Sequence, residues 1–181
     1  MNTANKITLL RVVLVPIFMA LFMIENNTAC TIAALVVFIL AAISDAVDGY
    51  IARNYNQITN FGKFVDPLAD KMLTTAAYVI LLHYGRMDVW ALMIVLAREF
   101  MVSGVRLVAA ADGKVIAAST WGKLKTISQM VGIIAAILLM LPIFSEEASI
   151  MVTAILIWIS VVFAVISGVD YIVKNRHVIK M

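Results

Sequence analysis

The sequence contains a single cysteine, Cys30, so neither a disulfide nor a thiolate cluster can form within one chain. Charged residues are also scarce, at 14% of 181 residues, and there are only two histidines. Hydrophobic residues make up 64% of the chain, and the mean hydropathy is +1.02. A water-soluble domain of this size could not bury so much apolar surface. We therefore expect an all-α polytopic membrane protein.

The apolar residues are grouped into six runs of membrane-spanning length. The first run lacks a small-residue cleavage site and is long enough to span a bilayer, which argues against a removable signal peptide. The sequence has no internal repeat, and the polar connections are short, so we expect one domain over residues 1–181. The predicted transmembrane helices cover about 7–24, 29–52, 62–82, 88–111, 121–143 and 148–173.

The distribution of positive charge predicts the orientation of these helices. If the N-terminus is cytoplasmic, Arg86 is the only cation in an outer loop, and Arg98 lies within the fourth run. The other lysines and arginines all fall at the inner ends and in the inner loops: Lys6, Arg11, Arg53, Lys63, Lys71, Arg106, Lys114, Lys123, Lys125, Lys174, Arg176 and Lys180. This asymmetry predicts six transmembrane helices with both termini on the cytoplasmic side.

Four aspartates are concentrated between residues 45 and 70, at the cytoplasmic ends of the second and third predicted helices. Asp45 and Asp48 are three residues apart, and Asp66 and Asp70 are four apart, so each pair shares a helix face. Carboxylates near a bilayer are costly, and clustered ones repel one another unless a cation lies between them. An all-carboxylate set predicts Mg²⁺ or Mn²⁺, and neither a histidine nor a second thiol is close enough to favour zinc.

An alternative is that these aspartates only form ion pairs with Arg53, Lys63 and Lys71. Such pairs would contribute, but they explain neither the spacing of the acids nor the neighbouring glycines, Gly49 and Gly62. The glycines remove side chains beside the carboxylates, which permits close approach of a ligand or close helix packing.

The segment resembles the signature of the CDP-alcohol phosphotransferases, integral membrane enzymes of phospholipid synthesis. Their pattern is D-x-x-D-G-x-x-A-R, a gap, and G-x-x-x-D-x-x-x-D. All eight fixed positions are filled here: Asp45, Asp48, Gly49, Ala52, Arg53, Gly62, Asp66 and Asp70. The resemblance covers nearly the whole chain, because the family fold also has six transmembrane helices.

The resemblance implies transfer of a substituted phosphate from a CDP-linked donor to an alcohol, with release of CMP. It implies that the aspartates bind two divalent cations that hold the diphosphate, and that Asp70 is also the general base. Gly49, Ala52, Arg53 and Gly62 would line the CDP site, where the Arg53 guanidinium suits a phosphate. The family tends to form homodimers, and no nucleic-acid partner is expected.

A second group of charged residues indicates the acceptor. Arg98 lies inside the fourth predicted helix, with Arg106 two turns later, and Lys123 and Lys125 open the fifth. An intramembrane arginine is either paired or faces a polar cavity. Glu99 could pair with Arg106, but several cations on the cytoplasmic half favour an anionic acceptor.

These stretches, together with Asn5, Thr8 and Arg11, resemble the phosphatidylglycerophosphate-forming branch of the family; Ala4 stands where that branch usually has proline. The resemblance implies CDP-diacylglycerol as donor and sn-glycerol 3-phosphate as acceptor, at the cytoplasmic face of a bacterial cell membrane. Thr8 and Arg11 would join the acceptor-phosphate site with Arg98, Arg106, Lys123 and Lys125.

Three alternatives remain open. Inositol phosphate or phosphatidylglycerol could be the acceptor, because either would suit the same cations. A divalent-cation transporter could use the aspartates, although transport sites usually lie at the bilayer midplane and not at cytoplasmic helix ends. A purely structural membrane protein would leave the signature unexplained.

Overall fold

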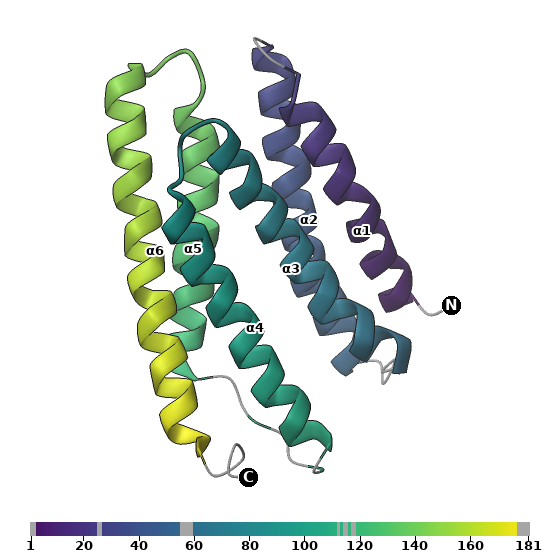
Figure 1. Ribbon diagram of the computed structural model, residues 1–181. Helices are drawn as coiled ribbons and strands as arrows, with labels where there is room; N and C mark the ends of the chain where they lie inside the picture. Colours follow the sequence, from purple (N-terminus) through teal and green to yellow (C-terminus); the bar gives the residue numbers. More distant parts are fainter. Residues whose placement is uncertain are drawn as a thin grey trace. The chain divides into compact units, whose positions relative to one another are not determined.

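The protein is all-α in the computed structural model shown in Figure 1. The structure describes residues 3–24, 27–54, 60–111, 113, 116 and 119–176, without the side chains of 3–4, 46, 48–54, 60–64, 66–67 and 70. The described part forms helices α1 (Thr3–Phe22), α2 (Thr28–Asn54), α3 (Asn60–His83), α4 (Val89–Ala111), α5 (Thr120–Leu139) and α6 (Glu146–Lys174). Each coincides with one of the six predicted helices, and no boundary differs by more than four residues.

The protein is a polytopic membrane protein. Among the described residues, four helices contain stretches long and apolar enough to cross a bilayer: Asn5–Phe22, Thr28–Asp45, Thr120–Leu139 and Glu146–Lys174. At a rise of about 1.5 Å per residue, 20 residues span roughly the 30 Å hydrocarbon core. Helix α4 is as long, but every 18-residue stretch of it includes Arg98, Glu99 and Arg106.

The chain divides into two compact units. The first consists of Met1–Leu81 with Met140–Phe144, and the second of Leu82–Leu139 with Ser145–Met181. Helices α1, α2 and nearly all of α3 therefore belong to the first unit, and α4, α5 and α6 to the second.

In the first unit, α1 packs along α2 through aromatic side chains. Phe18 of α1 and Phe38 of α2 are fully buried, and their ring centroids lie 5.5 Å apart. Phe22 extends the group, 6.0 Å from Phe18. Aromatic pairs in such tilted arrangements contribute about 0.5–1.5 kcal/mol each. This close packing matters in a bilayer, because lipid tails are as apolar as the helix surface and the hydrophobic effect does not drive helix association.

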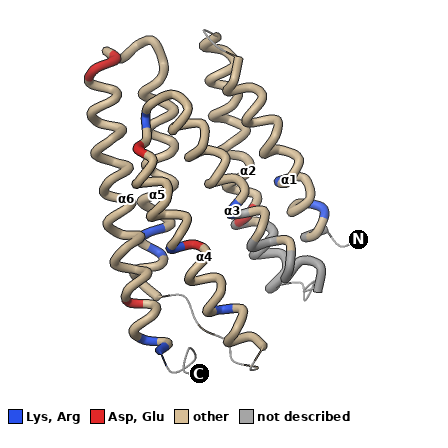
Figure 2. The backbone as a smooth tube through the Cα atoms, in the orientation of Figure 1, with Lys and Arg blue, Asp and Glu red and all other residues tan. Residues whose placement is uncertain are grey.

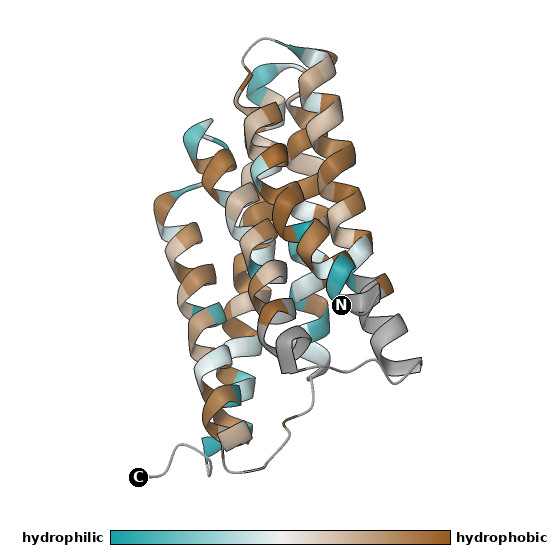
Figure 3. Ribbon diagram, turned by 90° about the vertical axis from the view of Figure 1, so that its right-hand side faces the viewer, coloured by the Kyte–Doolittle hydropathy of each residue, from teal (hydrophilic) through white to brown (hydrophobic). Residues whose placement is uncertain are grey.

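In the second unit, α6 packs against both α4 and α5. The buried face of α6 carries four small polar residues, Ser149, Thr153, Ser160 and Ser167, among apolar ones. Its exposed face carries large apolar side chains such as Val162 and Val169, and hydrophobic colours dominate the helical ribbons in Figure 3. Polar residues inside and apolar residues outside are the arrangement expected when lipid surrounds the bundle.

Two glycines allow the chain to turn sharply after a helix. Gly85 follows α3 with φ of +66°, and Gly113 follows α4 with φ of +69°. Left-handed backbone after a helix C-terminus strongly favours glycine. Helix α5 ends at Leu139, four residues before the predicted end at 143, because Pro142 disfavours helical backbone in the residue before it.

Candidate active site

The first aspartate of the predicted metal group, Asp45, is paired with an arginine of α1. The Arg11 Nη1 atom lies 2.8 Å from Asp45 Oδ1, and the Arg11 side chain is fully buried whereas that of Asp45 is 45% exposed. Arg11 Nε also donates to Ser44 Oγ at 3.2 Å and to the Ala41 carbonyl oxygen at 3.3 Å. Arg11 therefore fixes the end of α2 that carries the signature and compensates the charge of Asp45.

The polar residues at the start of α1 share one buried face. Asn5, Thr8 and Arg11 are spaced by three residues, and the most exposed of them, Asn5, is only 7% accessible. These three residues therefore lie inside the protein. Because the Arg11 guanidinium points toward α2 and Asp45, its predicted contact with the acceptor phosphate stays a prediction, as does that of Thr8.

Most of the signature falls outside the described side chains. Helix α2 contains Asp48, Gly49, Ala52 and Arg53, and helix α3 contains Gly62, Asp66 and Asp70. Each aspartate pair therefore lies within a single helix. The side chains of these seven residues lie outside the described part of the structure, so their roles in metal and CDP binding stay predictions.

The predicted acceptor residues Arg98 and Lys125 come together in the second unit through Glu99. Lys125 Nζ donates to Glu99 Oε1, and Arg98 Nη1 donates to the same oxygen at 3.4 Å. The side chains of Arg98, Glu99 and Lys125 are 11%, 17% and 7% exposed. Figure 2 shows blue (basic) and red (acidic) stretches lying beside one another near the middle of α4. A shared carboxylate compensates part of the cost of burying two cations.

Helix α6 supplies further contacts to this group. Arg98 Nε donates to Ser167 Oγ at 3.1 Å. Arg106 Nε donates to Tyr171 Oη at 3.3 Å, and its guanidinium carbon lies 5.6 Å from the centroid of the Tyr171 ring. Both arginines of α4 are thus held by side chains more than 60 residues away in sequence.

Lys123, like Arg106, has an exposed side chain, unlike the other predicted acceptor residues. It lies on α5, two residues before the buried Lys125, so the two lysines point to different sides of the helix. We name the group Arg98, Glu99, Arg106 and Lys125 the cation cluster.

Sequence reasoning did not identify Ser167 and Tyr171. They belong to the buried stripe of α6, which recurs every three or four residues from Ser149 to Tyr171. This periodicity was a usable signal, because small polar residues on one face of an apolar helix mark a packing face.

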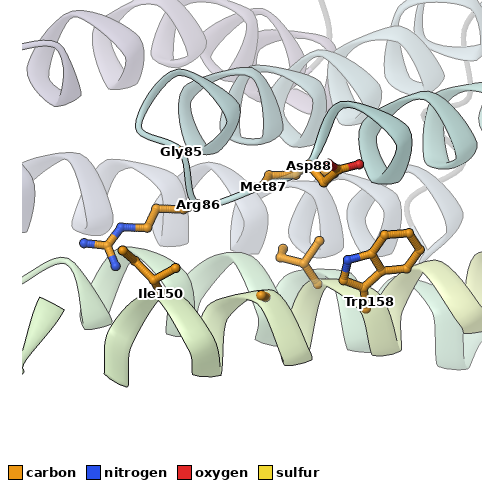
Figure 4. A pocket seen from close by; sticks show the side chains of 8 residues that line it. Gly85, Arg86, Met87, Asp88, Ile150 and Trp158 are labelled. Atoms are coloured by element: carbon orange, nitrogen blue, oxygen red, sulfur yellow. The ribbon is translucent and has the colours of Figure 1, made fainter. Parts of the chain in front are cut away.

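A cavity of about 230 Å³ lies elsewhere in the second unit, between the α3–α4 turn and the first half of α6 (Figure 4). Its lining includes Arg86, Asp88, Ile150 and Trp158, and Arg86 donates to Ser149 beside it. None of the sequence-predicted site residues lines this cavity.

Comparison with known proteins identifies the family. The sequence model of the CDP-alcohol phosphatidyltransferase family matches residues 1–166. The chain belongs to this family. In this member of the CDP-alcohol phosphatidyltransferase family, the signature aspartates lie toward the end of α2 and the beginning of α3.

Members of the CDP-alcohol phosphatidyltransferase family with curated descriptions are similar over almost the whole chain. The CDP-diacylglycerol–glycerol-3-phosphate 3-phosphatidyltransferase of Bacillus subtilis is 40% identical over 190 aligned positions, covering 99% of this chain and 97% of that protein. The protein of the same description from Rickettsia typhi is 38% identical, with 94% of each chain covered. A probable phosphatidylglycerophosphate synthase of Mycobacterium tuberculosis H37Rv is 42% identical, covering 96% of this chain and 81% of that protein.

Proposed function

We propose that this chain transfers the phosphatidyl group of CDP-diacylglycerol to sn-glycerol 3-phosphate, giving phosphatidylglycerophosphate and CMP. The observation that carries this proposal is the similarity, over nearly the whole chain, to relatives whose descriptions name this transfer. In the reaction, the acceptor hydroxyl oxygen forms a bond to the phosphorus that carries diacylglycerol. The bond from that phosphorus to CMP breaks, and the hydroxyl proton must be accepted.

The charge of the cation cluster supports a phosphate-bearing acceptor. Arg98, Arg106 and Lys125 carry three positive charges against the single negative charge of Glu99, a net charge of +2. A phosphate monoester carries about −1.5 to −2 near neutral pH, so it would balance this excess. We assign the acceptor phosphate to Arg98, Arg106 and Lys125, with Lys123 as an exposed cation on the same helix end.

For the α1 residues we propose a narrower role. Arg11 is fully buried and paired with Asp45, which supports a function in orienting that carboxylate. Thr8 lies one turn before Arg11 on the same buried face, and it stays in the proposed acceptor region.

We further propose that Asp45, Asp48, Asp66 and Asp70 hold two divalent cations, Mg²⁺ or Mn²⁺. The donor set fits such ions, because it consists of four carboxylates on the ends of two helices. When bound, the cations would neutralise charge that develops on the diphosphate oxygens.

Asp70 acts as the general base in this proposal, because an alcohol is a poor nucleophile until a carboxylate accepts its proton. Arg53 binds a phosphate of the CDP group through its planar guanidinium. Gly49, Ala52 and Gly62 leave room beside it for the nucleotide.

The proposed setting is the cytoplasmic face of a bacterial cell membrane. Six transmembrane helices with both termini inside agree with the positive-charge asymmetry and with the six helices of the structure. One catalytic domain spans residues 1–181, and by analogy with the family the protein forms a homodimer.

The test uses purified full-length protein in detergent with CDP-diacylglycerol, Mg²⁺ and a panel of acceptors, and follows CMP release. We expect release to require sn-glycerol 3-phosphate. Release with inositol phosphate or phosphatidylglycerol instead would keep the family and overturn the acceptor. No release with any acceptor, from monodisperse protein, would contradict the proposed function.

A further inference from the structure

Arg98 packs against two glycines and a serine from the other helices of its unit. We call these residues, Gly122, Ser167 and Gly168, the seat of Arg98. A Cβ atom added at Gly168 of α6 would lie 3.1 Å from Arg98 Cγ and 3.9 Å from Arg98 Cβ. A Cβ added at Gly122 of α5 would lie 3.8 Å from Arg98 Nη2. The stem of the arginine therefore crosses α6 where that helix lacks a side chain, and its tip reaches the glycine on α5.

The residue next to Gly168 fixes the direction of the guanidinium. Ser167 is fully buried, and its Oγ accepts the Nε–H of Arg98 while donating to the Ala164 carbonyl oxygen. Because Ser167 is anchored to its own helix, the Nε edge of Arg98 has one preferred position. Glu99 accepts from Nη1 on another side of the guanidinium.

This seat determines which part of Arg98 can meet a ligand. The stem is held against Gly168, Nε by Ser167 and Nη1 by Glu99, so Nη2 is the nitrogen directed toward α5. A long arginine side chain has about 2 kcal/mol of rotamer entropy to lose on binding a phosphate, and contacts that hold it beforehand reduce this loss.

We propose that Ser167 and Gly168 are positioning residues for Arg98, and that they set the affinity for the phosphate of the acceptor without touching it. The inference rests on the proposed function, since it takes Arg98 as a ligand of that phosphate. Neither residue belongs to the aspartate signature or to the cationic stretches, and both lie about 70 residues from Arg98 in sequence.

The Ser167 side chain offers a matched pair of variants. Ser167→Thr keeps the hydroxyl oxygen, whereas Ser167→Val has the shape of threonine without it. We expect Ser167→Val to raise the KM for sn-glycerol 3-phosphate about tenfold, because a hydrogen bond to a charged group is lost. The KM of Ser167→Val for CDP-diacylglycerol should stay within about twofold of the wild-type value. Ser167→Thr should keep the acceptor KM close to that of wild type.

The Gly168 side of the seat has its own control. Gly168→Ala places a methyl group against Arg98 and should raise the acceptor KM by a similar factor. Gly132→Ala is the comparison, because the nearest atom of another helix to its added Cβ would be the Leu156 carbonyl oxygen, at 3.7 Å. We expect Gly132→Ala to leave both KM values unchanged.

The outcomes separate this inference from the proposed function. If wild-type protein does not use sn-glycerol 3-phosphate, both fail. If wild-type protein is active but Ser167→Val and Gly168→Ala change only the thermal midpoint, or change both substrates' KM values equally, the positioning role is wrong while the function stands. Should Gly168→Ala not yield monodisperse protein, the comparison of Ser167→Thr with Ser167→Val decides the matter alone.

Discussion

The partly buried carboxylate of Glu99 should contribute strongly to the thermal stability of the second unit. It accepts from Lys125 Nζ and from Arg98 Nη1, and the Lys125 side chain is 7% exposed. Glu99→Gln would leave both cations without this charge, and Lys125→Met would leave Glu99 without its closest partner. Removing one member of a buried pair typically costs about 3–5 kcal/mol, because the remaining charge is uncompensated.

For a chain of this size, such a loss should lower the midpoint of thermal unfolding in detergent by roughly 10 °C. The double variant, Glu99→Gln with Lys125→Met, should lose clearly less than the two single variants together, because it removes both charges of the Glu99–Lys125 pair and leaves only Arg98 without the carboxylate. Lys174→Met provides the control. Lys174 pairs with Asp170 at 2.7 Å but is 63% exposed, so its loss should cost at most about 1 kcal/mol. Additive losses in the double variant, within about 0.5 kcal/mol, would refute the coupling between Glu99 and Lys125.

Three further results are expected. Asp70→Asn should lower kcat by roughly 10²–10⁴ without shifting the thermal midpoint, since a general base contributes about that factor; near-normal turnover would remove Asp70 from the chemistry. Chelation by EDTA should abolish CMP release, and added Mg²⁺ or Mn²⁺ should restore it; release that persists in EDTA would contradict the metal assignment. Tyr171→Phe should raise the acceptor KM a few-fold because Arg106 loses its hydroxyl partner, and Tyr171→Leu should raise it more because the ring contact is lost too; equal values for the two variants would show that the ring contributes nothing.

The helices were predictable because membrane-spanning length is a property of the local sequence. The starts and ends of α2, α3, α4 and α6 differ from the expected ones by two residues or fewer. The end of α5 was placed too late, because the apolar run continues through Pro142 although the backbone leaves the helix at Leu139. The family was predictable for a related reason, since its signature consists of fixed residues at fixed spacing.

The contacts of the site were predictable only in part. The cationic character around Arg98 followed from the sequence. The sequence offered Glu99 as a possible partner of Arg106, whereas the structure shows Glu99 accepting from Arg98 and Lys125. That Lys125 would pair with Glu99, and that Ser167 would hold Arg98, depends on the register between α4, α5 and α6. This register results from side-chain packing along whole helices, and no local pattern encodes it.

The central claim is that this chain makes phosphatidylglycerophosphate. It is tested most directly by incubating the purified full-length protein with CDP-diacylglycerol, Mg²⁺ and radiolabelled sn-glycerol 3-phosphate, and measuring the label in the lipid fraction. We expect one labelled phospholipid carrying an additional phosphate monoester, formed in step with CMP and missing with Asp70→Asn. Label that stays in the aqueous phase while wild-type protein releases CMP, or that enters lipid without CDP-diacylglycerol, would contradict it.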